Sequence, residues 1–185
     1  MKLKGKTALI TGASVGIGLA TAQQMAEQGA KIALNSQSDR GQAAVDALNA
    51  KHGENTAIFL QGSVEDPAHA EKMVGDAIKT FGQLDILVNN AGIVRGGRID
   101  NCTLEDWEDT MAVNVRGVFL MSKFAVQHML ERGCGSIVHN ASVCGVKGLK
   151  ERASYSASKG AVVALTWAMA QDYVDKGIRV NCVNP

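Results

Sequence analysis

The chain lacks the signals that mark membrane, secreted or nucleic-acid-binding proteins. Its 185 residues include only two prolines and 4% aromatic residues, and the formal net charge is +1. No long run of one charge sign occurs, so the charge pattern gives no reason to expect nucleic acid or a membrane surface as a partner. The apolar run near the start is too short for a signal peptide, and no later stretch approaches a membrane span.

Cysteine and histidine are also too sparse and scattered to suggest a disulfide framework or a metal site. No two of the four cysteines have C-x-x-C spacing; they are Cys102, Cys134, Cys144 and Cys182. The four histidines are equally dispersed. We therefore predict reduced thiols in a cytoplasmic protein, with no bound metal.

What the chain does contain is a regular alternation of short apolar runs and longer helical patterns. The apolar runs predict strands at residues 7–11, 31–35, 56–60, 84–90, 136–140 and 178–183. The helical patterns predict helices at residues 16–28, 39–52, 67–81, 104–132 and 154–175. This alternation predicts one α/β domain over residues 1–185, a doubly wound parallel sheet between two helical layers. Such sheets bind ligands beyond the carboxyl ends of their strands, where strand order reverses.

A glycine-rich turn directly follows the first predicted strand. The sequence "TGASVGIG" at residues 11–18 places glycines at 12, 16 and 18, just where the first helix begins. Glycine lets the backbone approach a ligand closely, and a helix start offers free N–H groups to a phosphate. The pattern therefore indicates either a dinucleotide site or a tight turn without a ligand.

Two residues of "YSASK" form a second candidate site. Tyr155 and Lys159 are four residues apart and lie on one face of a helix. A phenol in water ionises near pH 10, and a neighbouring ammonium favours the phenolate. Ser142 directly follows the fifth predicted strand, so its hydroxyl lies at the carboxyl edge of the sheet. Taken singly, Ser142 could be a strand-end cap and Asn114 a solvated helix residue.

Together these motifs resemble those of the short-chain dehydrogenase/reductase family. The resemblance runs from residue 6 to residue 185 and rests on "TGASVGIG", on "NNAG" at residues 89–92, and on Asn114, Ser142, Tyr155 and Lys159 in this order. It implies a Rossmann-like sheet and hydride transfer between a nicotinamide cofactor and a ketone or secondary alcohol. It further implies that Tyr155 transfers the proton, Ser142 holds the substrate oxygen, Lys159 binds the nicotinamide ribose, and a kink at Asn114 holds a water. Within the family, this chain resembles both 3-oxoacyl-carrier-protein reductases and dehydrogenases of small hydroxy acids, sugars or cyclic alcohols.

The resemblance also implies a set of cofactor contacts. They are Gly12, Ser14, Val15, Gly16, Ile17, Gly18, Ser36, Gln37, Ser63, Val64, Asn90, Ala91, Gly92, Tyr155, Lys159 and Pro185. An acidic residue after the second strand would mark NAD, but here the stretch reads "LNSQSDR". We therefore favour NADP over NAD, with Arg40 as the one nearby cation.

Other residues are interpreted as structural or remain open. Trp107 and Trp167 fall in apolar helical stripes together with Met121, Met129 and Met169, and we predict that all five lie in the core. His139 is predicted to be a packed strand residue. Lys147, Lys150 and Arg152 lie close to Tyr155 in sequence, and they form either a carboxylate site or a solvated basic loop.

Relatives of this kind usually continue some sixty residues beyond the position of Pro185. The resemblance implies that those residues supply a substrate lid and a seventh strand, so we expect six strands of seven here. It also implies a homodimer or homotetramer built on the helices carrying Asn114 and Tyr155. The alternative function is a non-catalytic fragment that binds nucleotide or only assembles with partners.

Overall fold

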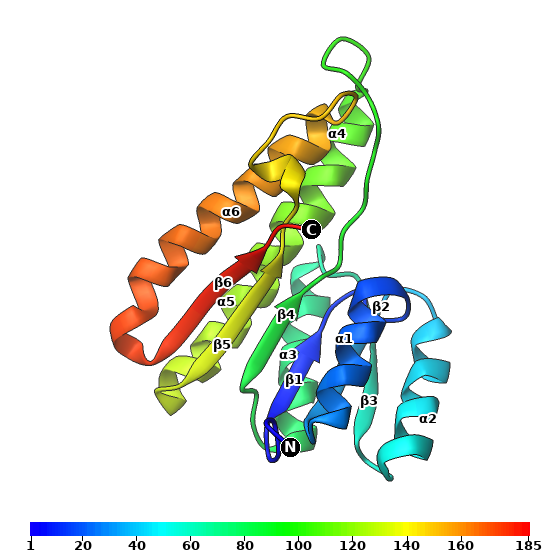
Figure 1. The fold of residues 1–185 in the computed structure, drawn as a ribbon, viewed down its shortest axis with the longest axis vertical. Coiled ribbons are helices and arrows are strands. Elements are labelled where there is room, and N and C mark those ends of the chain that lie inside the picture. Colours follow the sequence, from blue (N-terminus) through cyan, green and yellow to red (C-terminus); the bar gives the residue numbers. More distant parts are fainter.

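A computed structural model describes all residues from Met1 to Pro185 as one parallel sheet between layers of helices (Figure 1). The strands are β1 (Thr7–Ile10), β2 (Lys31–Ser36), β3 (Ala57–Gln61), β4 (Ile86–Asn89), β5 (Gly135–Asn140) and β6 (Ile178–Val183). Their spatial order is β3-β2-β1-β4-β5-β6, and every neighbouring pair is parallel. The order reverses between β1 and β4, which confirms the Rossmann-like fold predicted from the sequence.

The helices connect the strands in the order that the sequence predicts. They are α1 (Gly16–Glu27), α2 (Arg40–His52), α3 (Pro67–Phe81), α4 (Leu104–Met111), α5 (Gly117–Arg132) and α6 (Ala153–Tyr173). Short turns η2 (Val143–Gly145) and η3 (Val174–Lys176) flank α6. None of these helices is both long enough and apolar enough to cross a membrane.

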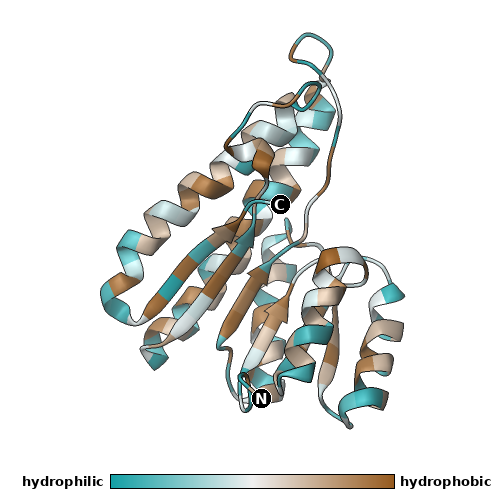
Figure 2. Ribbon diagram, viewed as in Figure 1, coloured by the Kyte–Doolittle hydropathy of each residue, from teal (hydrophilic) through white to brown (hydrophobic).

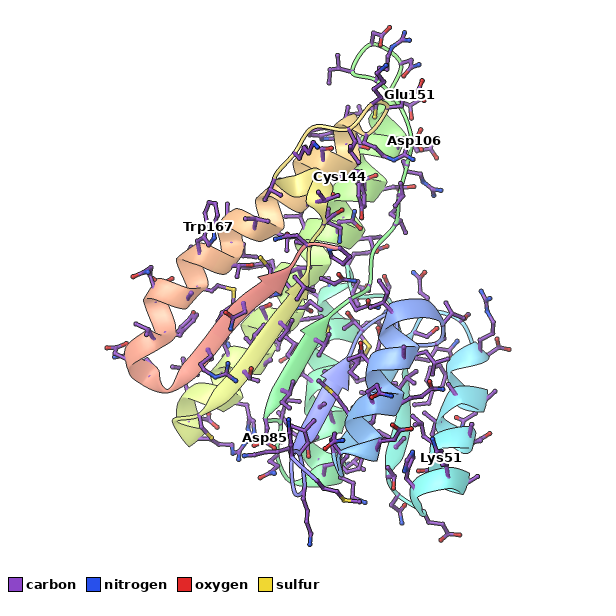
Figure 3. All side chains as sticks on the ribbon, in the orientation of Figure 1. Lys51, Asp85, Asp106, Cys144, Glu151 and Trp167 are labelled. Carbon is purple, nitrogen blue, oxygen red and sulfur yellow. The ribbon has the colours of Figure 1, made fainter.

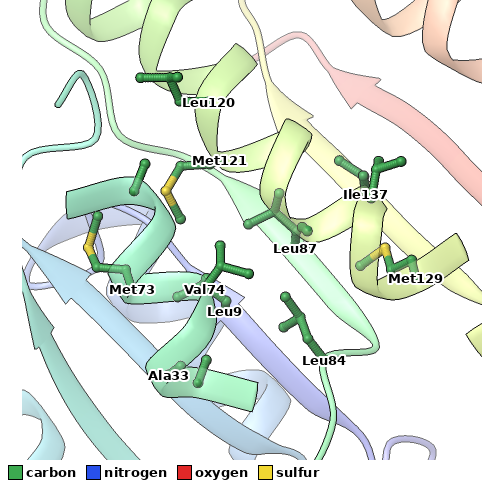
Figure 4. Packing of buried hydrophobic residues seen from close by; sticks show 14 of the residues in the cluster. Leu9, Ala33, Met73, Val74, Leu84, Leu87, Leu120, Met121, Met129 and Ile137 are labelled. Atoms are coloured by element: carbon green, nitrogen blue, oxygen red, sulfur yellow. The ribbon is translucent and has the colours of Figure 1, made fainter. Parts of the chain in front are cut away.

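The two largest of three apolar clusters hold the layers to the sheet. One joins α3 and α5 to the sheet and contains Leu9, Leu87, Met121 and Ile137, all fully buried (Figure 4). The other joins α1 and α2 to β1 and β2 on the opposite face. The continuous apolar strands and the inner faces of the helices stand out in Figure 2. Burial of this surface is the main favourable contribution to folding.

One predicted helix is interrupted in the structure. Residues 104–132 form α4, then a π-helical turn η1 (Ala112–Arg116), then α5. A π turn inserts one extra residue per turn, and such turns are often found at functional sites. Here the inserted turn carries Asn114.

Both tryptophans were wrongly predicted to lie in the core. The side chain of Trp167 is 66% exposed and projects outward from α6 (Figure 3), while Trp107 is half-buried. The methionines Met121, Met129 and Met169 are buried as predicted. The error arises because helical periodicity identifies an apolar stripe but not what covers it.

Candidate functional site

The glycine turn after β1 packs against the segment that follows β4. Gly12 has φ of +60°, and a Cβ on it would lie 2.7 Å from the Cα of Ala91. At Gly18 a Cβ would lie 2.5 Å from Nδ2 of Asn90. Only glycine fits both positions, because a side chain would overlap the neighbouring backbone or amide. Val15, which precedes α1, provides no side-chain cap for the helix start.

Side-chain hydrogen bonds fix this turn at the point where strand order reverses. Asn90 Nδ2 donates to the carbonyls of Thr11 and Gly12, both at 3.0 Å. Thr11 Oγ1 accepts from the backbone N–H groups of Asn90 and Ala91, also at 3.0 Å. The backbone there is held open toward the helix start, which is the arrangement that suits a bound pyrophosphate.

A cavity of about 230 Å³ lies beside this turn, over β2 and β3. It is lined by Gly12, Ser36, Gln37, Ser63, Val64 and Ala91 among others. Asn35, which also lines the cavity, joins β2 to the end of β3, because its Nδ2 donates to the carbonyls of Leu60 and Gly62 at 3.0 Å. Glu65 is the one carboxylate in the lining, and Arg40 does not line the cavity.

A second cavity of about 190 Å³ adjoins the first, since Asn90 and Gly92 line both. It also contains Ile17, Ser142, Tyr155, Lys159 and Pro185. Residues more than a hundred positions apart in sequence are thus brought together at the carboxyl ends of β1, β4 and β5. The pair of cavities forms one elongated site across the point of strand reversal, and it fits an extended dinucleotide.

Lys159 lies in this second cavity as a nearly buried cation. Its Nζ donates to the carbonyl of Asn140 at 2.6 Å and lies 5.7 Å from the centroid of the Tyr155 ring. Burial lowers the pKa of Lys159 to about 8, from an ordinary value of 10.5. The ammonium therefore remains protonated at neutral pH, directly beside the phenol.

Ser142 occupies the end of β5 as the sequence predicts. Its Oγ accepts from the backbone N–H of Cys144 at 3.2 Å and lies 3.5 Å from the carbonyl of Pro185. The hydroxyl is thus a cap for η2, as one interpretation of the sequence holds, and it also lines the cavity with Tyr155. Capping fixes its position without removing it from the site.

Asn114 is fully buried, so it is not the solvated helix residue that one interpretation of the sequence allows. Its Oδ1 accepts from Ile93 N at 2.8 Å, and its Nδ2 donates to Ile93 O at 2.9 Å and to Ser158 Oγ at 3.0 Å. These bonds join the π turn to the strand-end segment and to α6. Asn114 thereby fixes the position of the helix that carries Tyr155 and Lys159.

His139 is a packed strand residue, as the sequence predicts. It is fully buried, and its Nδ1 lies 3.1 Å from Asn89 Nδ2. Burial, and to a smaller extent the charge of Lys159, lower its pKa to about 4. No cluster of three His, Cys, Asp or Glu side chains is placed to hold a metal.

The structure also identifies polar residues that the sequence motifs did not single out. Asn140 Nδ2 donates to Asn90 Oδ1 at 2.9 Å, and Asn140 O accepts from Lys159. Thr11 holds the turn, and Asn35 joins β2 to the end of β3. All of them lie at the carboxyl ends of strands, and that position is a signal that the sequence already contained.

Comparison with known proteins agrees with this geometry. The family model described as short chain dehydrogenase matches residues 6–185. An uncharacterized oxidoreductase of Thermotoga maritima is 48% identical over 186 residues, covering 100% of this chain and 72% of that protein. The 3-oxoacyl-[acyl-carrier-protein] reductase FabG of Staphylococcus aureus is 37% identical over 182 residues, covering 97% and 73%.

A solved structure is also similar along the whole chain. It is described as the crystal structure of NAD+-bound xylitol dehydrogenase and has a TM-score of 0.96 with 35% sequence identity. The match covers 100% of this chain and 71% of the other. The fold of this chain is therefore similar along its whole length to that of the xylitol dehydrogenase structure.

Proposed function

The chain belongs to the short-chain dehydrogenase family and is a nicotinamide-dependent oxidoreductase of alcohols and ketones, and we propose that Tyr155, Ser142, Lys159 and Asn114 form its catalytic site. One observation carries this assignment. The nearly buried ammonium of Lys159 lies 5.7 Å from the Tyr155 ring, in a cavity that Ser142 also lines.

In ketone reduction, the Tyr155 hydroxyl donates its proton to the carbonyl oxygen. The Ser142 hydroxyl donates a hydrogen bond to the same oxygen and stabilises the charge that develops there. The positive charge of Lys159 stabilises the phenolate that remains on Tyr155. In alcohol oxidation the proton moves in the opposite direction. When bound, the nicotinamide supplies or accepts the hydride.

The proposed cofactor contacts follow from the two cavities. The glycine turn at Gly12, Ser14, Val15, Gly16, Ile17 and Gly18 would hold the pyrophosphate at the start of α1. Ser36, Gln37, Ser63 and Val64 would hold the adenosine half, since all four line the larger cavity. Asn90, Ala91, Gly92, Lys159 and Pro185 line the region toward the proton-transfer residues. This order is supported by Asn90 and Gly92, which line both cavities.

We propose NADP(H) as the preferred cofactor. Ser36, Gln37 and Ser38 occupy the positions where an acid would repel a 2′-phosphate, and their hydroxyl and amide groups can bond it. No lysine or arginine lines this cavity, and Glu65 lines it from the far side. The preference over NAD(H) is therefore expected to be modest.

We also propose a single nucleotide-binding domain, a cytoplasmic location and assembly into a homodimer or homotetramer. The four cysteines are unpaired, which suits a reducing compartment. Assembly is supported by apolar side chains exposed on α5 and α6, since Phe119 is 49% and Trp167 is 66% exposed. A shallow hollow between these helices is lined by Phe119, Leu130 and Leu165. Exposed apolar faces of this kind usually mark an interface.

The first test is a fluorescence titration of the purified chain with NADPH and with NADH, followed by a screen of ketone reduction. Saturable binding together with turnover is the expected result. Binding without turnover of any ketone would favour a non-catalytic nucleotide-binding fragment. Binding of neither nucleotide would overturn the proposal.

A further inference from the structure

A third cavity, of about 790 Å³, lies beyond the catalytic one at the start of α6. It is lined by Gly97, Arg98, Lys150, Glu151, Arg152 and Ser156, among others. These residues come from two loops, one after β4 and one before α6. None of the residues that line this cavity lines the nucleotide site described above.

Backbone hydrogen bonds clamp the two loops together. Gly97 N donates to Glu151 O, and Ala153 N donates to Gly97 O, both at 3.0 Å. Glu151 has φ of +56°, a left-handed conformation that is unfavourable for a residue other than glycine. Such a conformation persists where the surrounding structure determines it, and it is often found at ligand sites. These two bonds hold Arg152, the N-cap residue of α6, in place. Figure 3 labels the adjoining Glu151.

Two of the three cations that line this cavity form no ion pair with an acid. Arg152 makes one hydrogen bond, from Nη1 to the carbonyl of Glu151 at 2.8 Å, and no ion pair. Lys150 is exposed and also has no ion pair. Arg98 differs, because it forms a bidentate pair with Asp100. Glu151 is the one carboxylate in the lining, against the two unpaired cations Lys150 and Arg152.

Arg152 is the side chain of this lining that best suits an oxygen anion. The Oγ of Ser156 has no exposed surface, so this hydroxyl is not counted as a contact. Arginine, with its planar fork of donors, suits a carboxylate better than lysine does.

This cavity lies within reach of the proposed proton-transfer residue. Arg152 is the N-cap residue of α6 and Tyr155 lies in the first turn of the same helix, three positions later. The loop after β4 connects the two sites, since Val94 lines the catalytic cavity and Gly97 lines the distal one. A substrate whose oxygen lies at Tyr155 can therefore extend toward Arg152.

From this arrangement we propose that the distal cavity binds a carboxylate of the substrate, with Arg152 as its main contact and Lys150 in support. The inference rests on the proposed function, because it assumes that the carbonyl or alcohol lies at Tyr155. It assigns the substrate class as linear oxo acids and the matching hydroxy acids. Neutral ketones and polyols lack the group that these residues recognise.

The test compares levulinate, an oxo acid, with its methyl ester, which has the same ketone and no charge. The wild-type kcat/KM for levulinate should exceed that for the ester by about 10- to 100-fold, as expected of a charge-assisted hydrogen bond. Arg152→Gln should remove this preference by lowering the levulinate value alone. Arg152→Lys should restore only part of it, because lysine binds the carboxylate without the bidentate geometry.

Lys147→Gln is the matched control. It removes one positive charge from the same loop but lies outside the cavity lining, so the preference should persist. NADPH titrations of each variant should be unchanged, which separates the distal cavity from the nucleotide site. Equal values for acid and ester in the wild-type chain, or an unchanged ratio in Arg152→Gln, would overturn the proposal.

Calorimetric titration of levulinate and its ester into the chain, with and without NADPH, makes the same comparison without turnover. Tighter binding of levulinate that is lost in Arg152→Gln supports the distal site even if no ketone is reduced. Failure of the proposed catalytic function is then distinguishable from failure of this inference. Absence of levulinate binding under both conditions would refute the carboxylate site.

Discussion

The ammonium of Lys159 donates a hydrogen bond to the backbone carbonyl of Asn140 at 2.6 Å. The side chain of Asn140 in turn donates to Asn90, and Asn90 donates to the carbonyls of Thr11 and Gly12. One chain of hydrogen bonds thus connects the proposed catalytic lysine to the glycine turn. Because the two carbonyls fix the amide orientation of Asn90, they also determine which end of Asn140 faces it.

Tyr155→Phe should lower ketone reduction by about 100- to 10,000-fold, because it removes the proposed proton donor. Affinity for NADPH should change little, since the ring and its packing beside Lys159 remain. Steady-state kinetics and a fluorescence titration measure the two effects. Tyr173→Phe removes a hydroxyl from the other end of α6 and is the control. Retained turnover in Tyr155→Phe would exclude Tyr155 as the acid.

Gly12→Ala should abolish tight nucleotide binding. The new Cβ would lie 2.7 Å from the Cα of Ala91, and the residue has φ of +60°, so the turn must move. Gly5→Ala is the matched control, because Gly5 also has positive φ but has open space around it. Thermal melting and NADPH titration should separate backbone strain, common to both variants, from the steric overlap at Gly12. Equal affinities in the two variants would contradict this account.

Ser36→Asp should shift the nucleotide preference from NADPH toward NADH. A carboxylate there repels a 2′-phosphate and can accept a hydrogen bond from a ribose hydroxyl. The ratio of the two dissociation constants should change by about tenfold or more, as expected of one unfavourable charge pair at close range. Gln23→Glu adds the same charge on the exposed side of α1 and should leave the ratio unchanged. A constant ratio in Ser36→Asp would place the ribose elsewhere.

The free energy of unfolding should rise with pH from about 8 to 10.5 through Lys159. Burial lowers the folded-state pKa of Lys159 to about 8, so in this window the unfolded chain binds more protons than the folded chain. Stability therefore increases as the pH passes upward through the folded-state pKa. Lys159→Met should flatten this part of the profile in denaturant titrations, whereas Lys123→Met on the exposed face of α5 should not. An identical slope in Lys159→Met would contradict the assignment.

Trp167→Glu should shift the chain toward monomer if α5 and α6 form an interface. The substitution places a charge in an exposed apolar face, so it destabilises an assembly while costing the folded monomer little. Light scattering coupled to size-exclusion chromatography measures the change. Ile99→Glu changes a residue that is 80% exposed on a loop away from this face, and it serves as control. An unchanged mass for Trp167→Glu would exclude this face.

The sequence predicted the order and type of the strands and helices closely, because apolar runs and amphipathic patterns are local. Helix α3 (Pro67–Phe81) and strand β6 (Ile178–Val183) have the predicted limits. The π turn around Asn114 was expected as a kink only through the family resemblance. Periodicity alone predicts a continuous helix there.

By itself the sequence determined the sheet, the glycine turn and the identity of the residues proposed for proton transfer, because backbone geometry and helical spacing follow from neighbouring residues. Tertiary structure decided what those residues contact. It buried Lys159 beside Tyr155, exposed Trp167, and joined Asn140 to Asn90 across the sheet. It also placed Arg152 and Ser156 in one cavity. Burial and charge compensation depend on contacts between segments far apart in the chain. Local patterns do not say which of these segments come into contact.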